Sequence, residues 1–251
     1  MNAREQQQQQ PTQPTIAGEA CVSASPFLFF NADCMEVMAQ YPDKYFDLAI
    51  VDPPYGINFD GHNQIIGEKG KKKGFSSKKL YVEKEWDLHR PNNAYFKELM
   101  RVSKNQIIWG GNYFADLLPP KKGWIYWDKK PNGENLTFSD GELAWTSFDK
   151  PLKMYSFGWI GFGMINSGTK KIHPTEKPKE LYAWILSRYA ESGFKIIDTH
   201  LGSGSIALAV DKANKLDNMN LEFVGVELDS EYYNAALNRF RLAHAQSCLS
   251  F

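Results

Sequence analysis

The residues with the clearest chemistry are Asp52-Pro53-Pro54-Tyr55, which follow an apolar run over 46–51. The run is short, rich in β-branched and aromatic residues, and stopped by prolines, so it predicts a buried strand. Ligands of open α/β sheets bind at the carboxyl ends of strands, where this carboxylate would lie. The prolines carry no N–H groups and leave stiff carbonyls without neighbouring donors. An acid, a rigid carbonyl and an aromatic ring suit a planar substrate bearing an NH2 group, although the same residues can also simply end a strand with a turn.

A second segment combines a strand end with two glycines. Asp198 ends a predicted strand, and the chain then turns through Gly202 and Gly204 into a predicted helix. Glycine there permits unusual φ values and close backbone approach. Glu227 ends a further predicted strand at an offset at which an acid can bond ribose hydroxyls. The pattern favours a nucleoside cofactor, but a dinucleotide-binding turn and a tight turn without a ligand fit it too.

Between these two segments, residues 171–178 form a predicted turn that leads into a helix beginning at Pro178. His173 has no partner at ligand spacing, and such a histidine is usually not a metal ligand. Lys177 and the N–H groups at the helix start are suited to an anionic group such as a carboxylate. The segment is therefore interpreted as a clamp on an anion.

The segments that must position these residues alternate between strand and helix patterns, which predicts an α/β domain with a mainly parallel sheet. Residues 58 to about 90 show neither period, and 156–171 is rich in glycine, so both are expected to be loops. The predicted strands are 27–31, 46–51, 106–109, 124–127, 142–148, 195–198 and 223–226, and the predicted helices are 33–40, 93–104, 178–191, 204–214 and 230–245.

The composition of the 251 residues is ordinary for a soluble enzyme, with 43% hydrophobic residues and a formal net charge of zero. Any nucleic-acid contact must therefore come from a local patch. The glutamine-rich start predicts a disordered tail over 1–24, followed by one domain over 25–251. Three cysteines without metal spacing fit a reducing compartment. No membrane-spanning run or signal segment is seen, so we expect a cytoplasmic protein.

Together the motifs resemble those of amino-group DNA methyltransferases. The family's Asp-Pro-Pro-Tyr motif is Asp52 to Tyr55, its glycine motif is similar to Asp198 to Ser205, and its ribose-binding acid corresponds to Glu227. Residues 31–34 and 173–178 are similar to two further motifs of the family. The catalytic motif comes first, as in the permuted β class. This order implies a Rossmann-like fold with a seven-stranded sheet, in which the catalytic and cofactor strands lie side by side.

The resemblance implies methyl transfer from S-adenosylmethionine to N6 of an adenine in DNA, flipped out or single-stranded. This is the activity of adenine-specific enzymes of restriction-modification or phage type. Catalytic roles are implied for Asp52, Pro53, Pro54 and Tyr55. Cofactor contacts are implied for Asp33, Cys34, His173, Thr175, Lys177, Asp198, Gly202, Ser203, Gly204, Ser205 and Glu227. The chain departs from the family at His200 and Leu201, where a Phe or Tyr is usual.

A lysine-rich loop follows the catalytic motif. Residues 64–84 hold seven lysines and two glutamates, a balance of +5. This placement favours phosphate contact over an ordinary solvated surface. DNA contact is expected from insertions around 58–90 and 129–172, whose small size predicts low sequence selectivity or recognition shared with a second subunit, as in a homodimer. The lysines expected on DNA are Lys71, Lys72, Lys73, Lys78 and Lys79.

Other functions stay open at this level. Cytosine N4 is an amino group that the same acceptors can bind, but the family's cytosine enzymes more often carry Ser in place of Asp52. RNA is a further substrate class. A nicotinamide-dependent dehydrogenase built on residues 202–207 leaves the motif at 52–55 without a role. A non-catalytic nucleic-acid-binding subunit is the last alternative, and nothing in the motifs shows decay.

Overall fold

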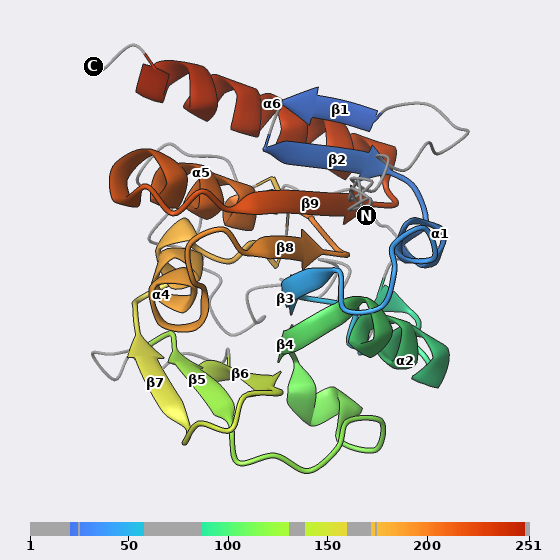
Figure 1. Cartoon of the computed structure of the whole chain (residues 1–251). Coiled ribbons are helices and arrows are strands. Elements are labelled where there is room, and N and C mark those ends of the chain that lie inside the picture. The colour runs from blue at the N-terminus through green and yellow to red at the C-terminus, as the bar shows by residue number, and fades with distance from the viewer. Residues whose placement is uncertain are drawn as a thin grey trace, which may run out of the picture.

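The computed structural model describes residues 21–24, 26–57, 87–130, 139–159, 172–173 and 175–248. Within these ranges, nine strands form one sheet in the order β1-β2-β9-β8-β3-β4-β6-β5-β7 (Figure 1). The strands are β1 (Cys21–Ala24), β2 (Phe27–Asn31), β3 (Phe46–Val51), β4 (Ser103–Trp109), β5 (Trp124–Asp128), β6 (Gly141–Thr146), β7 (Lys153–Ser156), β8 (Lys195–Asp198) and β9 (Glu222–Glu227). The helices are α1 (Cys34–Met38), α2 (Asn93–Val102), the 3-10 turn η3 (Gly111–Phe114), α4 (Lys179–Tyr189), α5 (Ser205–Asp217) and α6 (Ser230–Cys248).

The centre of the sheet is parallel, because β2, β9, β8, β3 and β4 pair in parallel in that order. Their carboxyl ends therefore share one edge, which carries Asn31, Glu227, Asp198 and Asp52. β3 and β8 are direct neighbours, with Leu48 opposite Ile196. The expected juxtaposition of the two motif strands is thus confirmed, although about 150 residues separate them in the chain.

Helices cover both faces of the sheet and bury a core on each. One core contains Leu48 and Ile50 of β3 packed with residues of α4, α5 and α6. The other contains Ala49 and Val51 of the same strand packed with residues of α1 and α2. β3 is buried on both faces because both alternating sets of its side chains are apolar, which is typical of a central parallel strand. The expected Rossmann-like architecture is confirmed.

The sheet differs from the expectation at its two edges, because it has nine strands where seven were expected. β1 pairs antiparallel with β2 at one edge, and β7 pairs with β5 at the other. The predicted tail over 1–24 was therefore too long, since residues 21–24 are a strand. β7 was missed because its residues are largely exposed and show no apolar alternation, as an edge strand permits.

Local capping explains where the site-bearing helices begin. The Asp33 side chain accepts a hydrogen bond from the Met35 N–H at 2.7 Å and caps α1. Asn92 caps α2 in the same way, accepting from Ala94 at 2.9 Å. α5 begins after Gly204, whose φ of 72° lies in the left-handed region that glycine adopts most easily.

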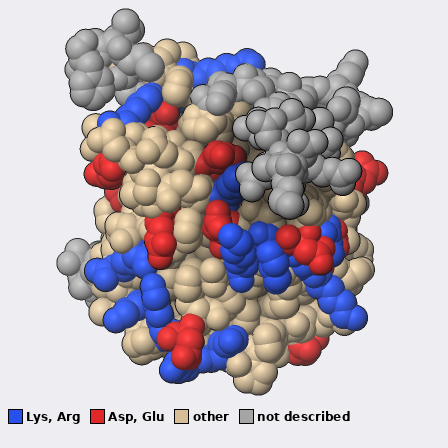
Figure 2. Space-filling model, in the orientation of Figure 1, with Lys and Arg blue, Asp and Glu red and all other residues tan. Residues whose placement is uncertain are grey.

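The surface carries both signs of charge. Basic and acidic side chains are interspersed on the face shown in Figure 2, in line with the formal net charge of zero. Among the described residues, no helix combines the length and apolar character needed to cross a membrane. The lysines expected on DNA and most of the two predicted insertions lie outside the described residues.

Candidate active site

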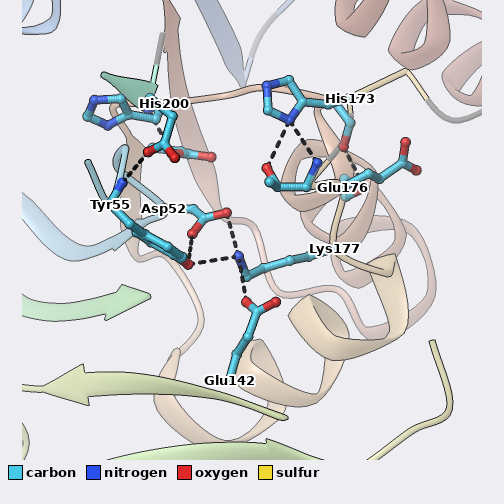
Figure 3. Close-up of polar contacts among 12 residues, drawn as sticks. Asp52, Tyr55, Glu142, His173, Glu176, Lys177 and His200 are labelled. Atoms are coloured by element: carbon cyan, nitrogen blue, oxygen red, sulfur yellow. Dashed lines mark hydrogen bonds and ion pairs between the residues drawn. The ribbon is translucent and has the colours of Figure 1, made fainter. Parts of the chain in front are cut away.

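The end of β3 holds a buried cluster of charged groups around Asp52. The Tyr55 hydroxyl donates to Asp52 Oδ1 at 2.6 Å. Burial, and then the charge of Asp52, raise the pKa of Tyr55 well above its usual value, so this hydroxyl stays a donor. The Lys177 ammonium forms an ion pair with Asp52 Oδ2. Figure 3 shows the three side chains converging, so each oxygen of the carboxylate has one partner.

Lys177 also pairs with a second acid. Its Nζ lies 3.1 Å from Glu142 Oε2, and Lys129 forms an ion pair with the same carboxylate. Burial alone would lower the pKa of Lys177, but the charges of Asp52 and Glu142 raise it above its usual value. Burial would likewise raise the pKa of Glu142, yet the two lysines outweigh it and lower that pKa to about 2. Lys177 and Glu142 are therefore both charged at neutral pH.

The ring of Tyr55 is fixed by its backbone and by its neighbours. Asp87 Oδ1 accepts hydrogen bonds from the N–H groups of Tyr55 at 2.7 Å and Gly56 at 2.9 Å. Tyr113 stacks on the Tyr55 ring, with 4.8 Å between centroids and 16° between planes. Gly110 approaches so closely that an added Cβ would lie 2.2 Å from that ring. The aromatic residue of the motif therefore has a defined position.

The turn after β8 places backbone donors beside two acids. Asp198 Oδ1 accepts from the His200 N–H at 3.0 Å. Glu227 accepts from the Gly202 N–H at 2.8 Å and from the Asp229 N–H at 2.9 Å. Gly202 has a φ of 52°, which supports this tight turn. Both carboxylates thus lie at neighbouring strand ends and are held by N–H groups of the backbone.

These two acids differ from Asp52 in their charge environment. Burial raises the pKa of Asp198 to about 8, and burial also raises the pKa of Glu227. In the part of the chain that the structure describes, neither carboxylate has an ion-pair partner within 4.0 Å. A positively charged ligand would therefore stabilise the ionised form of both carboxylates.

His200 is one of the two positions, with Leu201, at which the sequence departs from the Phe or Tyr that the resembled family usually carries. Burial lowers its pKa to about 4, so it is neutral at physiological pH. Its Nδ1 lies 2.9 Å from the Thr199 hydroxyl, which is 2.7 Å from the Tyr95 hydroxyl. The ring also makes an edge contact with Tyr95. A neutral, packed imidazole adds no positive charge to the turn.

Two further predicted motifs lie beside the glycine turn. The Asn31 side chain donates to the Glu227 carbonyl at 2.8 Å, which joins the end of β2 to the end of β9. Burial and Asp33 raise the pKa of Cys34 to about 12, so this thiol is not a thiolate. The His173 ring lies 3.8 Å from the position a Cβ on Gly202 would take, and its Nδ1 is 2.9 Å from the Thr175 hydroxyl.

The structure thus divides the predicted site residues between two adjoining groups. The residues of the glycine turn, Glu227 and the 31–34 segment gather at the ends of β8, β9 and β2, with His173 against them. Lys177 was expected in the same group, but its ammonium contacts Asp52 and Glu142 instead. The described residues hold no cluster of His, Cys, Asp and Glu suited to a metal ion.

Several residues of the site were not predicted from the sequence. Glu142 could have been noticed as an acid within an otherwise apolar predicted strand. Tyr113 follows the Gly110-Gly111 pair that ends β4, which marks a close approach. Asp87 has no such signal, because its surroundings show neither period. Arg239 donates to the Ser203 carbonyl at 3.0 Å from α6, a contact that only the fold reveals.

An open α/β sheet with a glycine turn and acids at its carboxyl edge fits the Rossmann-like fold of methyltransferases. A family model described as DNA methylase matches residues 121–238. The type II methyltransferase M2.DpnII of Streptococcus pneumoniae is 22% identical over 84% of this chain and 88% of its own length. The chain is therefore similar to DNA methylases over residues 121–238 and, at 22% identity, to type II methyltransferases over most of its length.

Solved structures show the same fold. The crystal structure of an M1.HpyAVI–SAM complex aligns with a TM-score of 0.50 and 20% identity over 85% of this chain and 98% of that one. The PvuII DNA methyltransferase, described as cytosine-N4-specific, aligns with a TM-score of 0.51 and 15% identity over 85% of this chain and 86% of its own. At these identities the likeness concerns the fold alone.

Proposed function

We propose that this chain transfers a methyl group from S-adenosylmethionine to the N6 amino group of adenine in DNA. The observation that carries the proposal is the direct pairing of β3 with β8. It brings the acid and ring of the Asp52–Tyr55 motif next to the glycine turn and its two carboxylates. A site for an amino-bearing base and a site for a nucleoside cofactor therefore adjoin at one edge of the sheet.

The donor set after β8 and β9 fits S-adenosylmethionine. Two buried carboxylates without an ion-pair partner among the described residues would favour a ligand with net positive charge. Glu227 is placed to accept hydrogen bonds from ribose hydroxyls, and the turn at Gly202 leaves room for close backbone approach. When bound, this cofactor supplies a methyl group attached to a positively charged sulfur, which makes the methyl carbon electrophilic.

The chain's own residues would prepare the amino group to attack that carbon. The nitrogen is a poor nucleophile because its lone pair is shared with the ring. Asp52 and the Pro53 carbonyl would accept its two hydrogens and draw the lone pair out of the ring plane. One N–H proton becomes acidic only after the N–C bond has begun to form, so Asp52 acts first as an acceptor. Preorganised acceptors of this kind need no rearrangement during the reaction.

The target base must leave the duplex or be presented single-stranded, since the amino group cannot reach Asp52 from within a base stack. Tyr55 would then stack on the base, a contact worth about 1–3 kcal/mol in other single-strand-binding proteins. Contacts with Tyr113 and with the Gly110 backbone fix the position of its ring, which supports this role.

The acid at position 52 favours adenine, but cytosine N4 is the second candidate because the motif accommodates either amino group. The test incubates the protein with DNA and S-adenosylmethionine and then analyses the digested nucleosides by mass spectrometry. N6-methyl-2′-deoxyadenosine in the digest, absent with an Asp52→Ala control, supports the proposal. N4-methyl-2′-deoxycytidine would instead support the second candidate, and an unmodified digest would reject both.

A further inference from the structure

Lys177 is the most completely buried charged side chain of the Asp52 cluster, with 2% of its side chain exposed. It lies directly before α4, and its ammonium reaches across to β3 and β6. Its two ion-pair partners are Asp52 on one side and Glu142 on the other (Figure 3). The Trp109 ring, centred 5.2 Å from Nζ, borders the same space.

We infer that Lys177 is a positioning residue for the methyl-accepting amino group, which orients the Asp52 carboxylate and compensates its charge, and is not a cofactor ligand. The inference rests on the proposed function and adds a residue to its acceptor side. It also reassigns a residue that the sequence had placed against the cofactor.

Charge balance is the first argument. Lys129, Glu142, Lys177 and Asp52 form a chain in which each charge neighbours the opposite one. Two cations and two anions give the chain a net charge of zero. Removing one member of a buried ion pair leaves the other uncompensated, which is strongly unfavourable. The site can therefore hold an ionised Asp52 without a charge from the substrate.

Orientation is the second argument. An ionised carboxylate has about four lone-pair sites on its two oxygens. The Tyr55 hydroxyl occupies one site on Oδ1, and the Lys177 ammonium occupies one on Oδ2. These two donors fix the rotation of the carboxylate about its own axis and leave a lone pair on each oxygen. The ion pair with Glu142 also restrains the ammonium, so Lys177 has little freedom to move toward a bound ligand.

The position of the uncompensated acids is the third argument. A lysine serving the cofactor site would pair with Asp198 or Glu227, where no cation lies within ion-pair distance among the described residues. The charge of Lys177 also lowers the pKa of Asp198, but this is a minor effect beside burial. Its direct ion pairs are with two acids that border the amino-group site, which places the ammonium on the acceptor side.

The test compares Lys177→Met with the double variant Lys177→Met/Glu142→Gln. The single variant removes the cation paired with Asp52 and leaves the cluster with one excess negative charge, so thermal stability should fall. The second substitution returns the cluster to a net charge of zero and should restore part of the loss. The rate of methyl transfer at saturating cofactor and DNA should fall about 100-fold in both variants, as for loss of one preorganised group. Cofactor affinity, measured by calorimetry, should stay within about twofold of wild type.

Lys215→Met is the matched control, because Lys215 pairs with the buried Asp211 on the same helix, α5, and donates to the His244 carbonyl of α6, away from the site. It should lower stability without lowering the rate at saturation. If Lys177→Met proves insoluble, Lys177→Gln keeps a donor to Asp52 and carries the same comparison of rate and cofactor affinity.

Two outcomes would overturn the inference. A rate that returns with stability in the double variant would make Lys177 merely structural. A cofactor affinity reduced tenfold or more would return it to the cofactor site. A wild-type protein that methylates no nucleic acid would instead reject the proposed function itself, so the two failures are distinguishable.

Discussion

The acids at the two neighbouring strand ends are prepared in opposite ways. Asp52, after β3, is bonded by the side chains of Tyr55, three residues away, and of Lys177, 125 positions away. Among the described residues, Asp198 and Glu227, at the ends of β8 and β9, accept hydrogen bonds only from backbone N–H groups. The difference indicates the charge of the ligand that each site would bind. A compensated carboxylate can receive a neutral amino group, whereas uncompensated carboxylates favour a ligand that brings its own positive charge.

Removing the Asp52 carboxylate tests this difference between the two sites most directly. We expect Asp52→Ala to lower the rate of methyl transfer at least about 100-fold, or roughly 3 kcal/mol, because a preorganised acceptor is lost. Cofactor affinity should change little, since the other strand ends stay intact. Radiolabelled methyl transfer and calorimetry measure the two quantities. A near-native turnover with bound cofactor would contradict this account of the acceptor.

The opposite substitution is Asp198→Asn, which removes charge from the turn after β8. We expect cofactor affinity to fall about tenfold or more, because hydrogen bonds to charged groups contribute about 1.5–3 kcal/mol. The rate at saturating cofactor should fall far less than in the Asp52 variant. An unchanged dissociation constant in calorimetry would show that the acid is not part of the cofactor site.

The pKa of about 8 at Asp198 also predicts a pH dependence of cofactor binding. A cationic ligand favours the ionised carboxylate, so binding lowers this pKa and releases a proton below pH 8. Affinity should therefore rise with pH, by up to about tenfold per unit, and level off above about 8. Calorimetry in buffers of different ionisation enthalpy detects the proton. Asp198→Asn should abolish the release, and a release that survives in the variant would assign it elsewhere.

Gly110→Ala tests how tightly the Tyr55 ring is fixed. The new Cβ would lie 2.2 Å from the ring at a φ of 68°, so the ring must move. We expect a rate loss of about tenfold and a stability loss of about 1–3 kcal/mol. Gly193→Ala is the matched control, because its φ of 82° imposes similar backbone strain with nothing within 4 Å of the Cβ. Equal rates in the two variants would mean that the ring position is unimportant.

The smallest expected effect is that of Tyr55→Phe, which keeps the ring and removes the hydroxyl bonded to Asp52 at 2.6 Å. Loss of one buried hydrogen bond costs about 0.5–1.5 kcal/mol. The rate should fall about 3- to 10-fold, with base stacking retained. Steady-state kinetics on single-stranded DNA checks this, and a loss as large as that of Asp52→Ala would mean that the hydroxyl takes part in the chemistry itself.

The centre of the fold was predictable from the chain, whereas its edges and its long-range contacts were not. β3 and β8 match their predicted bounds because both are short apolar runs with clear stops. β7 has no such pattern, since an edge strand needs no buried face. The ion pair of Lys177 with Asp52 could not be predicted from the sequence, because 125 positions separate the two residues. A lysine before a helix suggests an anion in general, and only the topology decides which carboxylate it meets.

The contacts of Arg239 have a consequence for how the protein becomes active. This residue of α6 donates to the Ser203 carbonyl in the glycine turn and pairs with Glu176, the neighbour of Lys177, at 2.9 Å. α6 is synthesised after every other described element. The contacts of Arg239 with the glycine turn and with Glu176 therefore form only when α6 docks. A nascent chain lacking this helix would carry all the motifs without a finished catalytic centre.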